Sequence, residues 1–182
     1  MPSFYTASGD QGETDFLGKG RISKSSLRIE TVGCVDEANA SLGLARAFCT
    51  DQKSKFILLE IQKHLYLLMS ELSAPPDVAS KFDHLNEEHV RWVEEQISVL
   101  EEIVELPNAF IIPGNSPAGG AIDLARTIVR RAERRAVELL EAKLINKQVL
   151  IAYLNRLSSL LFVLEIYEIF ISGEQFQLAN EV

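Results

Sequence analysis

An arginine-rich segment, residues 110–135, has the residue types and spacing best suited to chemistry. It holds five of the ten arginines, although the net charge of the whole 182-residue chain is −8. Arg126, Arg130 and Arg134 follow one another at intervals of four residues, so in a helix they line one edge. Guanidinium groups along one edge repel one another unless an anion lies among them, and polyphosphate oxygens match the guanidinium fork. The spacing therefore predicts an anion-binding edge for a polyphosphate.

The same spacing is also typical of a solvated helix face held by ion pairs. Asp123 and Glu133 lie near enough along the helix to neutralise part of the charge, while Arg131 and Arg135 point further round. Spacing alone leaves both interpretations open.

The first 24 residues differ in composition from the rest of the chain. They contain four glycines, a cluster of Thr, Ser and Asp, Arg21 and two lysines, with no helical period. Such a loop offers backbone N–H groups and positive-φ positions, which is how loops wrap phosphate oxygens. It is not a Walker A motif, because the spacing from Gly12 to Gly18 is one residue too long and Gly20 stands where Ser or Thr is needed. Taken alone, the segment favours an unstructured N-terminal arm.

Several other chemistries are excluded by composition or spacing. The chain has 26 acidic and 18 basic residues, and this acidic excess argues against general nucleic-acid binding. A di-iron site needs Glu three residues before His, but Ile61, Lys81 and Asn86 precede the three histidines at that spacing. Cys34 and Cys49 are too far apart for a CxxC site, and no secretory signal is recognisable. We expect reduced core thiols in a cytoplasmic protein.

Helical periodicity covers the remainder of the chain, and no strand pattern competes with it. The predicted helices span about 25–49, 54–73, 86–105, 116–143 and 147–172. Ser116 is the expected N-cap of the fourth, with Pro117 at its first position. The pattern predicts one all-α domain over 1–182, an up-and-down five-helix bundle at 25–172 with a glycine-rich arm at 1–24 and a loose tail at 173–182.

The fifth predicted helix is apolar on nearly every side, which places it at the bundle centre. Glu165 and Glu168 interrupt its longest apolar run, so we expect a core helix and no membrane span. Asn155, Ser159 and Phe162 share one face, and Asn155 is expected to be buried with partners for its polar atoms.

Four segments together resemble the PduO-type ATP:cob(I)alamin adenosyltransferases, over nearly the whole chain. Residues 5–24, YTASGDQGETDFLGKGRISK, are similar to the family's N-terminal arm, and residues 32–43, VGCVDEANASLG, to its Gly-x-Val-Asp-Glu segment. Residues 110–135, FIIPGNSPAGGAIDLARTIVRRAERR, are similar to its Pro-Gly turn and arginine-rich run, and residues 153–162, YLNRLSSLLF, to its Leu-Asn-Arg-Leu-Ser segment. Four matched blocks in order are far more specific than any one of them.

The resemblance implies a ferritin-like homotrimer of five-helix bundles with active sites between adjacent subunits. It places ATP among thirteen residues: Thr6, Ala7, Ser8, Gly9, Thr14, Asp15, Lys24, Arg130, Arg131, Ala132, Glu133, Arg134 and Asn155. It implies an Asp36–Arg126 pair that shapes the catalytic site, and cobalamin contacts from Phe110 and Phe162, with Phe110 at the lower face of the corrin. Mg²⁺ is expected with ATP, and no protein side chain is assigned to it.

The implied activity transfers the 5′-deoxyadenosyl group of ATP to cob(I)alamin and releases triphosphate. A trimeric carrier that delivers adenosylcobalamin to a mutase without catalysis is the alternative, and a plain structural bundle would ignore the arm. A reductase and a mutase are the implied protein partners. Five positions depart from the family pattern: Ser25, Asn115, Ser159, Glu165 and Ile166.

Overall fold

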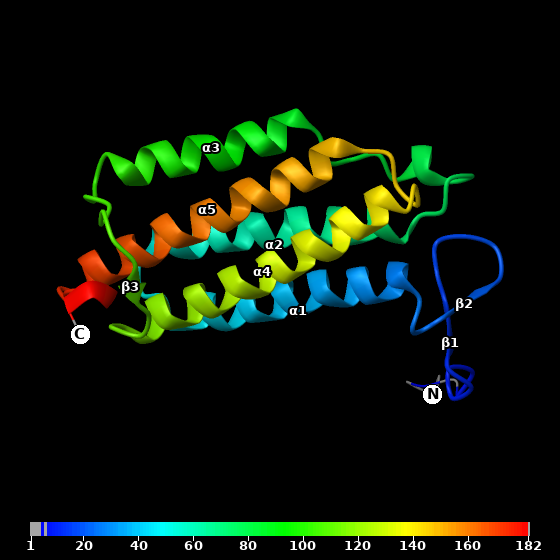
Figure 1. The fold of residues 1–182 in the computed structure, drawn as a ribbon, viewed down its shortest axis with the longest axis horizontal. Helices are drawn as coiled ribbons and strands as arrows, with labels where there is room; N and C mark the ends of the chain where they lie inside the picture. The colour runs from blue at the N-terminus through cyan, green and yellow to red at the C-terminus, as the bar shows by residue number, and fades with distance from the viewer. Residues whose placement is uncertain (1–4, 6, 182) are drawn as a thin grey trace.

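The computed structural model describes residue 5 and residues 7–181, and its architecture is a helical bundle. The helices are α1 (Leu27–Phe48), α2 (Gln52–Ser73), α3 (Glu87–Glu101), α4 (Pro117–Glu141) and α5 (Gln148–Ile171). They alternate in direction along one long axis (Figure 1). The five predicted helices and the all-α fold class are confirmed.

The ends of the helices follow local capping chemistry. Ser116 Oγ accepts a hydrogen bond from Gly119 N at 3.0 Å, and Pro117 occupies the first turn of α4 as predicted. Asp51 caps α2 in the same way by accepting from Ser54 N at 3.0 Å. The sequence around Ser116 therefore determines where α4 begins, and this start determines the position of the α4 arginines along the bundle axis.

Helix α4 packs against both α1 and α5, and α5 also packs against α3. The faces expected to be apolar are buried, including Ile122, Val129 and Ala136 of α4. Helix α5 is long and apolar enough to cross a bilayer by composition, yet 61% of that window is buried inside the fold. The core helix of a bundle has the same length and composition, so these properties of α5 are weak evidence for a membrane span.

Short strands add two features that the helical pattern did not predict. In the N-terminal segment, β1 (Glu13–Asp15) pairs antiparallel with β2 (Arg21–Ser23). At the other end of the bundle, β3 (Ile111–Ile112) pairs with β4 (Gln177–Leu178), and a 3₁₀ turn covers Ala179–Glu181. A second 3₁₀ turn covers Ala79–Lys81, between α2 and α3. The expectation of a loose tail is therefore wrong, because this tail forms backbone hydrogen bonds with the segment before α4. Ala179 N also donates to Phe110 O at 2.8 Å.

Candidate active site

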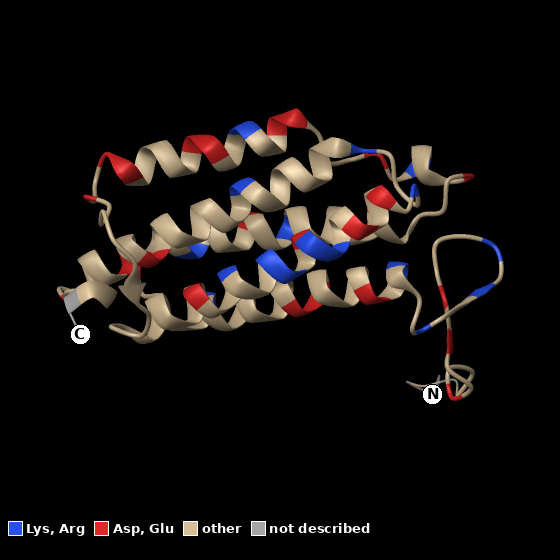
Figure 2. Cartoon of the chain, in the orientation of Figure 1, with Lys and Arg blue, Asp and Glu red and all other residues tan. Residues whose placement is uncertain are grey.

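Basic residues gather in the middle of α4 (Figure 2). Arg130 and Arg134 are exposed, and Arg134 donates to the backbone carbonyl of Arg130 at 3.0 Å. Within the described part of the chain neither forms an ion pair. Two unpaired guanidinium groups one turn apart provide an anion-binding edge.

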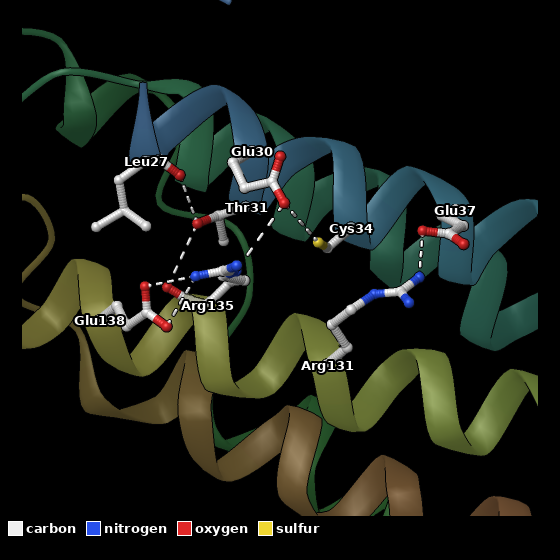
Figure 3. A network of polar contacts seen from close by, with 8 residues as sticks. All are labelled: Leu27, Glu30, Thr31, Cys34, Glu37, Arg131, Arg135 and Glu138. Atoms are coloured by element: carbon white, nitrogen blue, oxygen red, sulfur yellow. Dashed lines mark hydrogen bonds and ion pairs between the residues drawn. The ribbon is translucent and has the colours of Figure 1, made fainter. Parts of the chain in front are cut away.

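The other two arginines of this run are engaged by α1 and by α4 itself (Figure 3). Arg131 is ion-paired with Glu37 of α1. Arg135 is paired with Glu138 at 2.9 Å and lies 3.9 Å from Glu30. The salt-bridged interpretation thus holds for this side of α4, whereas the anion-binding interpretation fits the edge with Arg130 and Arg134. The two sides differ because only the first faces the acidic residues of α1.

Glu133 and Asn155 connect this edge to α5. Asn155 Nδ2 donates to Glu133 Oε1 at 3.1 Å, and its Oδ1 accepts from Arg156 at 3.0 Å. Asn155 is exposed, so the expectation of a buried asparagine is wrong. Ala132 is fully buried, so its side chain belongs to the core, and its expected contact with ATP stays a prediction.

A pocket of about 540 Å³ lies where α4 begins. It brings together Phe110, Phe162 and Arg126, which the sequence placed in one site, and it is also lined by Asp123. Phe110 is 86% exposed, an unusual position for a phenylalanine without a partner surface. The remaining lining residues are Pro107, Asn108, Ala109, Ile111 and Pro113. The pocket is mostly apolar with one guanidinium at its edge.

Arg126 is held by a carboxylate that the sequence did not assign to the site. Its Nε and one terminal nitrogen each lie 2.7 Å from Asp123 Oδ1, one helical turn earlier. Asp36 is exposed on α1, and no ion pair joins it to Arg126 among the residues described. The expected Asp36–Arg126 contact is therefore not made within this chain, and a contact between subunits stays a prediction. The three-residue spacing of Asp123 and Arg126 was the available sequence signal.

Helix α5 carries two buried carboxyl groups: Glu165 lies behind this pocket, near Asp123 and Arg126, whereas Glu168 lies near Ser54 and Cys49. Glu165 is fully buried, and Glu168 is 3% exposed. Burial, followed by the negative charge of Asp123, raises the pKa of Glu165 well above its usual range, although Arg126 acts in the opposite direction. Burial also raises the pKa of Glu168. Sequence analysis noted both as interruptions of an apolar helix but gave neither a role.

The N-terminal segment contains the β1–β2 hairpin, and the turns that precede β1, at residues 7–12, lie close to Lys24. A Cβ added to Gly9 would lie 3.0 Å from Lys24 Nζ, so the lysine lies across this glycine. Lys24 N donates to Gly12 O at 2.9 Å, and Ala7 has a positive φ of 57°. Thr14 and Asp15 lie on β1, and Ser8 O accepts from Arg21 at 2.8 Å. Thr6 lies outside the described residues.

The predicted site residues fall into three groups along the bundle. The arm lies at the end where α1 begins, the arginine edge lies near the middle of α4, and Phe110 precedes β3 at the opposite end (Figure 1). One chain therefore brings Phe110, Phe162 and Arg126 together but keeps the arm apart from them. A site that used all three groups would need more than one copy of the chain.

The fold and site define a class: an all-helical bundle with an edge of unpaired arginines beside an apolar pocket. The family model for cobalamin adenosyltransferase matches residues 4–168. The chain belongs to this cobalamin adenosyltransferase family.

Named relatives are similar over most of this chain. The corrinoid adenosyltransferase of Bacillus subtilis is 39% identical over 163 residues, covering 87% of this chain and 82% of that protein. PduO of Salmonella typhimurium is 37% identical over 164 residues, covering 89% of this chain and 48% of that protein. The chain thus spans about half the length of the Salmonella relative.

Solved structures show the same fold. A variant PduO-type ATP:corrinoid adenosyltransferase from Lactobacillus reuteri, complexed with cobalamin and ATP, superposes with a TM-score of 0.91 at 30% identity, covering 98% of this chain and 99% of that one. Another variant from the same organism, complexed with ATP, gives a TM-score of 0.89 at 32% identity, covering 96% of this chain and 99% of that one.

Proposed function

We propose that this protein transfers the 5′-deoxyadenosyl group of ATP to cob(I)alamin, giving adenosylcobalamin and triphosphate. The observation that carries the proposal is the continuity of one helix. Helix α4 begins at the apolar pocket of Phe110 and Phe162 and continues as the edge with the unpaired Arg130 and Arg134. An apolar ring system and a polyphosphate are thus accommodated side by side. The family and its relatives solved with ATP and cobalamin support the same reaction.

The proposed reaction needs no general acid or base from the protein. Cob(I)alamin is a strong nucleophile, and its cobalt attacks the 5′ carbon of ATP while the bond from that carbon to the triphosphate oxygen breaks. The protein holds the two reactants in line. Phe110 offers no ligand atom, so an aromatic ring at the lower corrin face leaves the cobalt without an axial donor. A cobalt without this ligand is more readily reduced to Co(I).

The leaving triphosphate gains negative charge, and the arginine edge stabilises it. Arg130, Arg134 and Lys24 supply the cationic groups, with Arg131 joining them when its pair with Glu37 opens. Backbone N–H groups of the arm around Gly9 supply further donors. Mg²⁺ would bind the phosphate oxygens of ATP and neutralise part of their charge.

We further propose a homotrimer in which the arm of one subunit closes over the arginine edge of its neighbour. The separation of arm and pocket along one chain supports this arrangement. The trimer also gives Asp36 a role. Asp36 and Arg126 do not pair within one chain, so an Asp36–Arg126 pair would join two subunits. A cytoplasmic location, a reductase that supplies Co(I) and a mutase that accepts the product complete the proposal.

The deciding experiment incubates the protein with ATP, Mg²⁺ and chemically reduced cobalamin and follows the visible spectrum. The expected result is an ATP-dependent spectral change that reports a cobalt–carbon bond, and light should then reverse this change by breaking the bond. An Arg130→Ala/Arg134→Ala double variant that melts normally is the matched control, and it should react far more slowly. Binding of adenosylcobalamin without any ATP-dependent spectral change would favour the carrier instead.

A further inference from the structure

Glu165 of α5 is a buried acid whose carboxyl oxygens are both unsatisfied. The residue is fully buried, and within the described part of the chain neither Oε1 nor Oε2 has a hydrogen-bond partner. A buried polar atom without a partner costs on the order of 1–3 kcal/mol, and an ionised carboxylate costs more. Such a group in a native core needs a physical explanation.

The first turns of α4 lie directly against this side chain. A Cβ added to Gly119 would lie 3.7 Å from Glu165 Cγ, an ordinary van der Waals distance, so the start of α4 packs against this side chain. The charged groups that act on Glu165 are Asp123 and Arg126, both on α4. These two line the pocket of Phe110 and Phe162.

Charge balance shows which form Glu165 adopts. Asp123 is 8% exposed and already carries the charge that matches Arg126. If Glu165 were also ionised, two carboxylates of this chain, in addition to Asp36 of a neighbouring subunit in the proposed trimer, would share the Arg126 guanidinium. Such an excess of negative charge in poorly solvated surroundings is unfavourable. Burial and Asp123 both raise the pKa of Glu165, in agreement with a neutral acid near pH 7. A neutral carboxyl group carries one O–H donor.

We propose that Glu165 is a positioning residue for the corrinoid pocket, which as a neutral acid donates a hydrogen bond to Asp123 and so fixes Arg126 at the pocket edge. Both contacts from Arg126 go to Oδ1 of Asp123, so the donated bond is assigned to Oδ2. The interaction of Glu165 with Asp123, through charge and through a side-chain hydrogen bond, shows that the two carboxyl groups are neighbours. The corrinoid role rests on the proposed function.

Ionisation of Glu165 has a defined sign for stability. A glutamate in the unfolded chain has a pKa of about 4.3, and the folded value is higher. Between these values the folded state binds the extra proton, so unfolding free energy falls as pH rises from about 4.3 towards the folded pKa. Glu165→Gln removes this slope while keeping the size of the side chain and an N–H donor.

The first test needs no activity. Infrared spectra of the full chain at pH 7 are compared between wild type and Glu165→Gln, and the wild type should show a protonated-carboxyl band that the variant lacks. Melting temperature is then followed from pH 5 to pH 9, where the wild type should lose more stability than the variant. Absence of the band, or identical pH profiles, would overturn the neutral acid whether or not the protein is an adenosyltransferase.

The second test measures positioning with ATP and chemically reduced cobalamin. Glu165→Leu should raise the KM for corrinoid about tenfold and leave the KM for ATP unchanged, because Arg126 loses its support. Glu165→Gln should restore the corrinoid KM to within about threefold of wild type. Equal changes in both KM values, or no rescue by Gln, would overturn the positioning role. A wild type without turnover would instead count against the proposed function, and the infrared result would still stand.

Discussion

Arg131 of α4 donates to the carboxylate of Glu37 on α1, and this contact joins the two helices beside the proposed triphosphate site. The side chains are 43% and 54% exposed, so water screens the pair and its contribution to stability is small. The contact instead determines how available Arg131 is to an anion. Arg130, the preceding residue, has no such competitor among the described residues.

Removal of the Glu37 charge is expected to strengthen ATP binding. Glu37→Gln releases Arg131, and since exposed pairs contribute about 0.2–1 kcal/mol, the Kd should fall about 1.4- to fivefold at low salt. Calorimetric titration with ATP measures this change. Adding Arg131→Ala should abolish the gain, and a gain that survives in the double variant would contradict the mechanism.

Arg130 is expected to contribute more to ATP binding than Arg135. Arg130→Ala should raise the Kd for ATP by roughly ten- to a hundredfold, because a charge-assisted contact contributes about 1.5–3 kcal/mol. Arg135→Ala is the control, since its guanidinium is engaged by Glu138 and Glu30. Equal losses in the two variants would show a general effect of positive charge rather than a specific contact.

Phe110→Ala should change the cobalt step without changing the fold. The side chain is 86% exposed, so its removal should leave the melting temperature within about 2 °C of wild type. ATP affinity should be retained, while adenosylation of cob(I)alamin slows by roughly tenfold or more. Phe56→Ala, at a residue 56% exposed on α2, is the control and should turn over normally. A large loss of ATP binding in Phe110→Ala would contradict the assignment.

Arg28 is expected to matter for stability and not for ligands. Its guanidinium is 5% exposed and donates to the carbonyls of Leu72, Ala74 and Leu144, which end α2 and precede α5. Arg28→Met leaves these acceptors unpaired and should cost about 2–4 kcal/mol of unfolding free energy, measured by urea denaturation. Arg91→Met, at an exposed site on α3, should cost under about 0.5 kcal/mol. Comparable losses would place the effect elsewhere.

His64 gives the protein an acid-sensitive core. Its Nδ1 lies 3.1 Å from Tyr153 Oη, its ring meets Trp92 edge-on, and burial lowers its pKa to about 4. The unfolded chain therefore takes up the proton first, so stability is lost as pH falls from about 6.5 to 4, by about 1–2 kcal/mol after allowance for solvent screening. His64→Gln should flatten this slope in melting experiments, while exposed His84→Gln should not. An unchanged slope in His64→Gln would assign the acid sensitivity to other groups.

The sequence by itself determined the five helices, the cap at Ser116 and the position of the arginines on one edge of α4. These follow from local rules, because helical periodicity and capping depend on residues within a few turns of one another. The four matched segments also indicated the family, which the comparisons established.

Only the tertiary structure decided which arginines are occupied, because that depends on what the neighbouring helix presents. Arg131 meets Glu37 across α1, whereas Arg130 faces away, and helical spacing alone does not distinguish them. The burial of Glu165 against Asp123 and the exposure of Asn155 were equally beyond local rules. A side chain's environment is determined by the packing of elements far apart in the chain, and here the packing of α5 on α4 changed a polar interruption in an apolar helix into a buried neutral acid behind the pocket.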